Sequence, residues 1–501
     1  MRKYFNVNGT CYPEKHYMVD LGSRLKEIRV LVDRGDYFVI NRAHQYGKTT
    51  LLRALADYLM DNYGILSLNF QALSTADFVN EFAFVAAFAD EIVRAAESTD
   101  LAASIFDRDA LNTLKRIGRN DKELVNLREL FNDLMALCAA YSSHPLVLIT
   151  DEVDSASNHQ VFLDFLAQLR TLYLARKDTA AFQSVILAGV YDIKNLKQKI
   201  RRGEEHLYNS PWNIAADFQV SLSFSVSDIE GMLTDYERDC HTGMDIKTVS
   251  GLIYDYTSGY PYLVSRICKR MDERADLLSG QDEYAADKNW SKAGVKAAVK
   301  ELLLDPNTLF DDLRKKIEDY PELRHMLFNG KIFPYNPDNF VIGVGSMFGF
   351  IKEQNGMAVV ANRIFETRLY NLVLSEELMG SAIYQAALMD KNQFIQNSRL
   401  NMELVLQKFV EYFTDIYGNN SERFVEENVR KLFLLYMKPI INGKGNYYVE
   451  ARTRDLRRTD VIIDYGGQQH AIELKIWRGE EYHRRGDCLK LSPGSCHLAA
   501  S

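Results

Sequence analysis

A short apolar run that leads into a glycine-lysine-threonine sequence is the feature that most limits what this chain can fold into. Residues 37–41 (YFVIN) predict a buried strand, and residues 48–62 predict a helix. A loop between a buried strand and a helix N-terminus can turn its backbone N–H groups toward a phosphate. The sequence therefore predicts a phosphate-binding loop, in which Lys48 contacts the β- and γ-phosphates of ATP and the Thr49 hydroxyl binds Mg²⁺.

The first position of this loop departs from the usual pattern, which opens with glycine. Arg42 stands there instead, so the first turn of the loop must accommodate a side chain. The predicted nucleotide contacts are Arg42, Gly47, Lys48, Thr49 and Thr50. The motif alone leaves another interpretation open, namely a helix N-terminus with a surface lysine.

A second motif follows about a hundred residues later. Residues 146–150 (LVLIT) predict a buried strand that ends in Asp151 and Glu152. In a parallel sheet, the carboxyl ends of the strands form the ligand-binding edge. We expect Asp151 to hold Mg²⁺ and Glu152 to polarise the attacking water, and Asp154 is a weaker candidate for a helper. Solvated acids at a strand end are the alternative.

The first 225 residues alternate apolar runs with amphipathic stretches, which predicts an α/β fold with a parallel sheet covered on both faces. Further strands are predicted at 66–70, 184–188 and 218–222, and further helices at 78–96, 124–141 and 162–175. Helices dominate afterwards. Ser227 and Asp228 are predicted to cap one of them, and Pro261 to lie in the first turn of another.

Three further regions follow this P-loop core, which we place at residues 1–225. A helical lid is predicted at 226–305, and a winged-helix-like module at 306–375 with β-like pieces at 339–342 and 358–360. Residues 376–501 are predicted to form a helical linker followed by an α+β domain.

Composition favours a cytoplasmic protein. The net charge is −8, and six cysteines are scattered without a CxxC pair, a pattern typical of reduced thiols. The N-terminal residues show no secretory signal. No apolar stretch reaches the length of about 18 residues that is needed to span a bilayer. We therefore expect no membrane partner.

Several blocks together resemble the bacterial AAA-ATPase-like family, in the AAA-type and archaeal-ATPase branch of P-loop proteins. The blocks are YFVINRAHQYGKTTLL, LVLITDEVD, ILAGVYDIKNLK and NSPWNIAADF. Members of this family also carry arginine at the first loop position. The resemblance implies ATP and Mg²⁺ as cofactors and ATP hydrolysis as the activity. It also suggests that the turn at 257–261 lies where a helical lid meets the nucleotide, and a turn that only starts a helix is the equal alternative.

Four other polar residues of this region are weaker candidates for the ATPase site. Tyr191 and Asp192 follow the strand predicted at 184–188 and could sense the γ-phosphate, although ordinary loop roles fit them better. Arg201 and Arg202 could supply an arginine finger to a neighbouring subunit, which would require a homo-oligomer. A solvated charge run is the alternative for these two arginines.

Carboxylates also converge near the end of the chain. Strands are predicted at 447–450, 460–464 and 470–475, with Gly466 and Gly467 as a two-residue hairpin turn. This register places Asp460 opposite Glu473, and Lys475 on the same strand face as Glu473. Because facing carboxylates repel each other, we expect Asp460 and Glu473 to share Mg²⁺ or Mn²⁺.

This hairpin resembles the core of PD-(D/E)xK nucleases, a domain in which AAA-ATPase-like proteins commonly end. The resemblance implies that Asp460, Glu473 and Lys475 are catalytic and that DNA or RNA is the substrate. Additional carboxylates could come from Glu426, Glu427 or Glu450. A cluster of arginines with Trp477 and Tyr482 could grip a nucleic acid, and a charged sheet edge is the alternative.

The tail departs from this nuclease pattern. After IELKIWRG, the family continues with a helix and a strand, whereas this chain reads GDCLKLSPGSCHLAAS. The domain therefore reads as C-terminally incomplete, with an uncovered sheet edge. A regulatory ATPase whose degenerate C-terminal domain binds a protein partner is the main alternative, and a nucleotide-binding scaffold without turnover is another.

Overall fold

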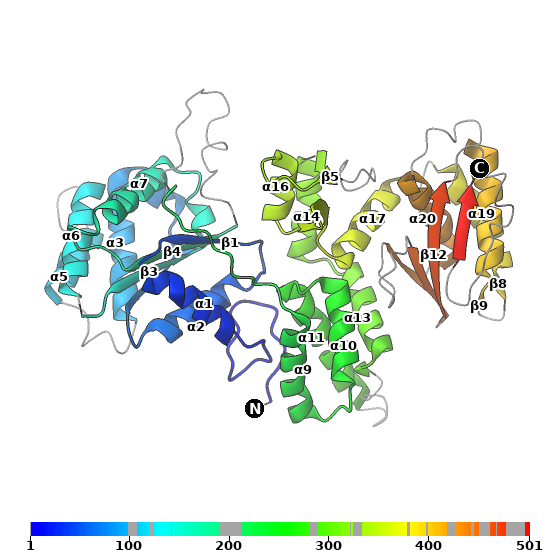
Figure 1. The fold of residues 1–501 in the computed structure, drawn as a ribbon, viewed down its shortest axis with the longest axis horizontal. Coiled ribbons are helices and arrows are strands. Elements are labelled where there is room, and N and C mark those ends of the chain that lie inside the picture. Colours follow the sequence, from blue (N-terminus) through cyan, green and yellow to red (C-terminus); the bar gives the residue numbers. More distant parts are fainter. Residues whose placement is uncertain are drawn as a thin grey trace. The chain divides into compact units, whose positions relative to one another are not determined.

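The fold is described from a computed structural model, drawn in Figure 1. The described residues are 2–98, 108–119, 125–141, 143–190, 212–279, 289–320, 322–323, 333–377, 381–396, 399–417, 426–441, 445–449, 461–466, 468–476 and 496–500. The chain divides into two compact units. The first holds Met1–Ile246 and Gly259–Asp272, and the second holds Lys247–Ser258 and Glu273–Ser501. The four-part division predicted from the sequence stays a prediction.

A four-stranded parallel sheet forms the centre of the first unit. Its strands are β1 (Phe38–Asn41), β2 (Gly64–Asn69), β3 (Leu146–Asp151) and β4 (Ser184–Gly189), in the order β1-β4-β3-β2. One face is covered by helices α1 (Gly22–Asp33) and α2 (Lys48–Leu59). The other face is covered by α3 (Glu81–Glu97), α5 (Arg108–Gly118), α6 (Leu127–Ala140) and α7 (Gln160–Ala175) (Figure 1). The predicted parallel α/β fold is confirmed.

Alternate residues of each strand enter two separate apolar cores. Val39 and Leu148 pack in the core beneath α3, α5, α6 and α7. Ile40 and Ile149 point the other way, into the core beneath α1 and α2. Because both faces are buried, the strands carry uninterrupted apolar runs, which is why the LVLIT segment could be recognised as a parallel strand.

The strand predicted at 218–222 is wrong. A single bridge pairs Ala216 with Phe38 of β1, and no ladder continues from it among the described residues. The Phe218 ring instead stacks on Phe38, with 5.8 Å between the ring centroids. Val220 and Leu222 are buried against the core beneath α1 and α2. The apolar pattern of this segment therefore reflects packing on the sheet rather than strand pairing.

The helices that follow include α9 (Val226–Cys240), α10 (Ile246–Thr257), α11 (Pro261–Ser279) and α13 (Lys292–Leu304). The cap of α9 is Ser225, so the prediction of Ser227 is wrong by two residues. The Ser225 hydroxyl accepts the N–H of Asp228, and the Asp228 carboxylate accepts the N–H of Ser225. This reciprocal capping box uses Asp228 as predicted. Pro261 lies in the first turn of α11, also as predicted.

A small three-stranded sheet lies in the second unit. Its strands are β5 (Phe333–Pro334), β6 (Ile351–Gln354) and β7 (Met357–Val360), in the order β5-β7-β6. The neighbouring helices in sequence are α14 (Thr308–Asp319), α16 (Phe340–Met347) and α17 (Arg363–Glu377). The β-like piece predicted at 339–342 is wrong, because Asn339 caps α16 by accepting the N–H groups of Val341 and Ile342.

The last part of the second unit starts with helices. They are α18 (Ala382–Asp390), α19 (Met402–Tyr417) and α20 (Glu426–Ile441), and the two short strands β8 (Ile395–Gln396) and β9 (Arg399–Leu400) lie between α18 and α19. A four-stranded sheet follows, of β10 (Gly445–Val449), β11 (Val461–Tyr465), β12 (Gln468–Ile476) and β13 (Cys496–Ala500).

The register of this terminal sheet confirms the predicted hairpin, because Tyr465 lies opposite Gln468. The strands β10, β11 and β12 are antiparallel neighbours. The expectation of an uncovered edge beside β12 is wrong: β13 pairs with β12 in parallel, with Cys496 opposite Ile472. Among the helices of the described residues, none has both the length and the apolar character that crossing a membrane requires.

Candidate functional site

The loop between β1 and α2 has the backbone that a phosphate-binding loop needs. Gly47 is the N-cap of α2 and has a φ of 77°, in the left-handed region that glycine adopts without a side-chain clash. Gln45 also has a positive φ, of 59°. The first N–H groups of a helix have no partner within the helix, so the start of α2 offers donors to an anion.

Lys48 is buried inside this loop, with 5% of its surface exposed. Its ammonium donates to the carbonyl oxygens of Arg42, at 2.9 Å, and of Ala43, at 3.2 Å. Burial lowers the pKa of Lys48, and nearby carboxylates, with Glu152 first among them, oppose that shift. The loop therefore holds a desolvated cation that faces the acidic turn after β3.

Thr49 and Asp151 lie side by side. The Thr49 hydroxyl donates to Oδ2 of Asp151 at 2.6 Å, so two oxygen ligands from α2 and β3 already converge. Asp151 ends β3 at the carboxyl edge of the parallel sheet and is buried. Because Mg²⁺ binds protein oxygens, this donor pair fits the ion. The sequence prediction for Thr49 and Asp151 thus has a geometric basis.

Glu152 follows in a backbone conformation that is rare for a residue with a side chain. Its φ is 55° and its ψ is 39°, and its N–H donates to Oδ1 of Asp151 at 2.9 Å. Burial raises the pKa of Glu152, Asp151 and Asp154 raise it further, and Lys48 opposes them. A residue held in a sparsely populated conformation beside a nucleotide loop is typical of a functional site.

The predicted nucleotide contact of Arg42 stays a prediction, and the structure gives its side chain contacts within the protein. Its guanidinium donates to the carbonyl oxygens of Asn41, at 2.8 Å, and of Val220, at 3.1 Å. It also lies 5.4 Å from the centroid of the Phe218 ring. Arg42 therefore braces the start of the loop against the segment that follows β4, and this role explains why arginine can replace the usual glycine.

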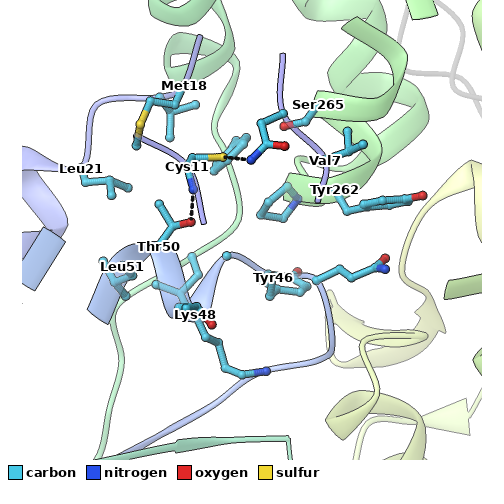
Figure 2. Close-up of a pocket in the computed structure, with 18 of the residues that line it drawn as sticks. Val7, Cys11, Met18, Leu21, Tyr46, Lys48, Thr50, Leu51, Tyr262 and Ser265 are labelled. Carbon is cyan, nitrogen blue, oxygen red and sulfur yellow. Dashed lines mark hydrogen bonds between the residues drawn. The ribbon is translucent and has the colours of Figure 1, made fainter. Parts of the chain in front are cut away.

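A cavity of about 260 Å³ opens next to the loop (Figure 2). Most of the residues that line it come from the loop and the start of α2, from the N-terminal part of the chain and from the start of α11, and Glu152 adds the turn after β3. They include Asn6, Val7, Cys11, Met18, Leu21, Tyr46, Lys48, Thr49, Glu152, Pro261, Tyr262 and Ser265. Apolar walls around a few convergent polar groups are typical of small-molecule sites.

The N-terminal segment, residues 2–20, is the part of the site that sequence reasoning missed. Figure 2 shows Cys11 above the start of α2, where its N–H donates to the Thr50 hydroxyl at 3.0 Å. Thr50 thus holds this segment against α2, and its predicted nucleotide contact stays a prediction. Farther along, the Tyr17 hydroxyl donates to Asp239 at 3.0 Å. Residues this far apart in sequence leave no periodic pattern to read.

The turn before α11 is tied to the loop. The Tyr260 hydroxyl donates to the carbonyl oxygen of His44 at 2.6 Å, and the Tyr260 ring meets the Tyr46 ring edge-on with 4.6 Å between centroids. A side-chain carbon at Gly259, where φ is 74°, would lie 1.9 Å from the carbonyl oxygen of Phe224. The turn predicted to meet the nucleotide therefore does contact the loop, and only glycine fits at its centre.

Several predicted residues lie outside the described part of the chain. They are Tyr191, Asp192, Arg201, Arg202, Glu450, Asp460, Trp477, Tyr482 and the basic cluster. Glu473 and Lys475 belong to β12, and Glu426 and Glu427 to α20, but their side chains also lie outside that part. Within the described residues, no group of three or more His, Cys, Asp or Glu side chains could hold a metal ion.

Solved structures with a similar fold include the Walker-type ATPase PABY2304 of Pyrococcus abyssi, at 12% identity and a TM-score of 0.49, covering 73% of this chain and 99% of that one. The ORC1 protein of Aeropyrum pernix, solved with DNA, shares 12% identity at a TM-score of 0.30 and covers 72% and 94%. The RuvB branch migration motor of Thermotoga maritima shares 14% identity at a TM-score of 0.32 and covers 68% and 92%. At these TM-scores the likeness carries no functional argument.

A search of curated protein sequences gave no match. The model of the AAA-like domain family matches residues 16–278. That range contains the loop with Lys48, the acidic turn with Asp151 and Glu152, and the turn around Gly259. The chain therefore belongs to the AAA-like domain family, and its first unit is an AAA-like P-loop ATPase domain.

Proposed function

We propose that this protein binds ATP with Mg²⁺ in the loop between β1 and α2 and hydrolyses it. The observation that supports this most is the convergence of Lys48, Thr49, Asp151 and Glu152 at the carboxyl edge of one parallel sheet. A 260 Å³ cavity adjoins them. Family membership supports the same activity.

The residues divide the chemistry among them. When bound, Mg²⁺ neutralises charge that develops on the phosphate oxygens. Lys48 exchanges its two carbonyl partners for phosphate oxygens, while Thr49 and Asp151 hold the ion. Glu152 carries a carboxylate whose raised pKa suits it to accept a proton from water. The N-terminal segment and Tyr262 form the walls for the nucleoside.

The binding step is tested by replacing Lys48 with alanine. We expect ATP affinity to fall by about a hundredfold or more, because a buried charge-assisted contact to phosphate is lost. Isothermal titration calorimetry with Mg²⁺ measures this. Lys26→Ala, which changes an exposed lysine on α1, is the matched control and should bind like the parent. Unchanged affinity in Lys48→Ala would rule out this loop as the site.

We also propose a second function, for the terminal sheet. The described register pairs Val461 with Ile472, and the proposal continues it by one position, to Asp460 and Glu473. One face of the sheet, with Ile463 and Ile472, is buried in the core with α19 and α20. The nuclease proposal assigns Glu473 and Lys475 to the other face, as strand alternation predicts from the sequence. We propose that this face is the active face of a PD-(D/E)xK-like nuclease that acts on DNA or RNA.

Nuclease activity is tested by plasmid cleavage with Mg²⁺ or Mn²⁺. The parent should nick DNA in a metal-dependent way, and Asp460→Ala and Lys475→Ala should lose cleavage while keeping the thermal unfolding midpoint of the parent. If the family-like helix and strand are required, a version with a family-like tail should cleave and the parent should not. If neither cleaves DNA or RNA or binds metal, the partner-binding alternative replaces the nuclease.

Two smaller proposals complete the account of the chain. Helices α14, α16 and α17 with the β6–β7 hairpin fit a winged-helix-like module in element order. Arg201 or Arg202 would complete the ATPase site of a neighbouring copy, so the protein should form a homo-oligomer with ATP. Sedimentation in the presence of ATP checks this. A monomer with full ATPase activity would remove the arginine-finger proposal.

A further inference from the structure

The acidic turn after β3 is attached to the end of β4 by a side chain that the hydrolysis scheme does not use. Oδ2 of Asp154 accepts the N–H of Val190 at 2.6 Å. Val190 is the residue directly after β4, and it is buried. The pairing between β3 and β4 ends at Thr150 and Leu187, so Asp154 supplies the acceptor that the β3 backbone no longer offers.

The approach of Asp154 depends on the residue before Val190. A side-chain carbon at Gly189 would lie 2.8 Å from Oδ1 and 3.0 Å from Oδ2 of Asp154. Both distances are shorter than a carbon–oxygen contact allows, so a larger residue would displace the carboxylate. Glycine at this position therefore serves the contact between the two strand ends.

The same peptide group also contacts the phosphate-binding loop. The carbonyl oxygen of Gly189 accepts the N–H of Arg42 at 3.1 Å, while the N–H of Val190 donates to Asp154. One peptide unit, Gly189–Val190, thus joins the first residue of the loop to the turn that carries Glu152. A peptide hydrogen-bonded on both sides is polarised by both partners.

The turn around Asp154 is held by hydrogen bonds within it. The Glu152 carbonyl oxygen accepts from both the N–H and the hydroxyl of Ser155, at 3.2 and 3.0 Å. The Asp154 carbonyl oxygen accepts from the N–H and the hydroxyl of Ser157, at 3.2 and 2.8 Å. Because Glu152 and Asp154 belong to one hydrogen-bonded turn, holding Asp154 in place also holds Glu152 in its left-handed conformation.

We infer that Asp154 is a positioning residue for ATP hydrolysis. Through the Gly189–Val190 peptide it keeps the Glu152 turn at a fixed distance from the loop that holds the phosphates. This inference rests on the proposed ATPase function and adds to it a residue that touches neither ATP nor Mg²⁺. It predicts a loss in turnover rather than in binding, because Lys48, Thr49 and Asp151 stay in place.

The test compares four proteins: the parent, Asp154→Ala, Asp154→Asn and the control Asp164→Ala, which removes an exposed carboxylate from α7. In Asp154→Ala, kcat for ATP should fall about tenfold or more, because misplacing a catalytic group is costly. The calorimetric Kd for ATP should stay within about twofold. Asp154→Asn keeps an oxygen that accepts the Val190 N–H and should recover kcat to within about threefold of the parent.

Hydrogen exchange supplies a readout that does not require activity. Without nucleotide, the segment 184–190 should exchange about tenfold faster in Asp154→Ala than in the parent and in Asp164→Ala. Parent-like exchange in Asp154→Ala would show that the Asp154 carboxylate does not hold the end of β4. Equal loss of kcat in the alanine and asparagine variants, or a parallel loss of ATP binding, would overturn the positioning role. If the parent binds ATP without hydrolysing it, the proposed function fails. The exchange result alone then decides whether Asp154 joins the turn after β3 to the end of β4.

Discussion

Glu152 combines a functional position with a cost in stability. Its carboxylate is half-buried, and burial together with Asp151 and Asp154 raises its pKa. Its backbone is also held at a positive φ of 55°. Residues of this kind persist at active sites because the surrounding structure holds them there. We therefore expect the ionised Glu152 carboxylate to lower the free energy of unfolding at neutral pH, a cost that accompanies its reactivity.

Replacing Glu152 with glutamine should raise the unfolding temperature at neutral pH when nucleotide and Mg²⁺ are absent. In the unfolded chain Glu152 ionises near its ordinary pKa, whereas the folded chain holds its proton to higher pH. Stability is therefore lost as pH rises from the ordinary pKa through the raised one. The gain from the glutamine variant should shrink as pH falls toward the ordinary glutamate pKa and disappear near pH about 3, where both states are protonated. A gain that persists or grows at low pH would contradict this assignment.

Among the elements, those with an uninterrupted pattern could be predicted from the sequence and those defined by distant contacts could not. β3 and α2 were predictable because a strand buried on both faces and an amphipathic helix leave clear periodicities. The segment 218–222 looks like such a strand, but its apolar residues pack on Phe38 and the core beneath α1 and α2 instead of pairing. The role of Arg42 could not be predicted either, because its partner Val220 lies far along the chain.

The turn before α11 gives a prediction with a matched control. Gly259→Ala should lower the free energy of unfolding by about 2 kcal/mol more than Gly243→Ala does. Both glycines have a positive φ, of 74° and 69°, but a carbon added at Gly243 meets nothing within 4 Å, whereas one added at Gly259 meets the Phe224 carbonyl oxygen at 1.9 Å. Urea unfolding measures the difference. Equal losses in the two variants would show that the close contact does not matter.

In the second unit, parts distant in sequence are joined through the terminal sheet. Arg363 of α17 pairs with Asp255 of α10, and its guanidinium lies 4.6 Å from the centroid of the Tyr256 ring and 5.3 Å from that of Tyr448 on β10. Lys296 of α13 adds an ion pair to Asp464 of β11 at 3.4 Å. Tyr448 and Asp464 lie on the face opposite the α19–α20 core. Such non-local contacts leave no trace in local sequence pattern.

Removing the Arg363 guanidinium should weaken the contacts among α10, α17 and β10. We expect Arg363→Ala to lower the stability of the second unit by about 2 kcal/mol, because an ion pair and two cation–π contacts are lost together. Arg363→Lys should recover only part of it, since an ammonium cannot lie flat against two rings. Hydrogen exchange of β10 measures the effect, with exposed Arg399→Ala of β9 as the control. Parent-like protection of β10 in Arg363→Ala would contradict this role.

The most direct test of the ATPase assignment is single-turnover phosphate release with protein in excess over ATP. The parent and Glu152→Gln are compared, and bound ATP is measured in the same samples. If Glu152 activates water at the loop of Lys48, the glutamine variant binds ATP like the parent and releases phosphate at least about a hundredfold more slowly. Release at the same rate by both proteins would contradict the assignment of Glu152. Binding without release by the parent would contradict hydrolysis itself.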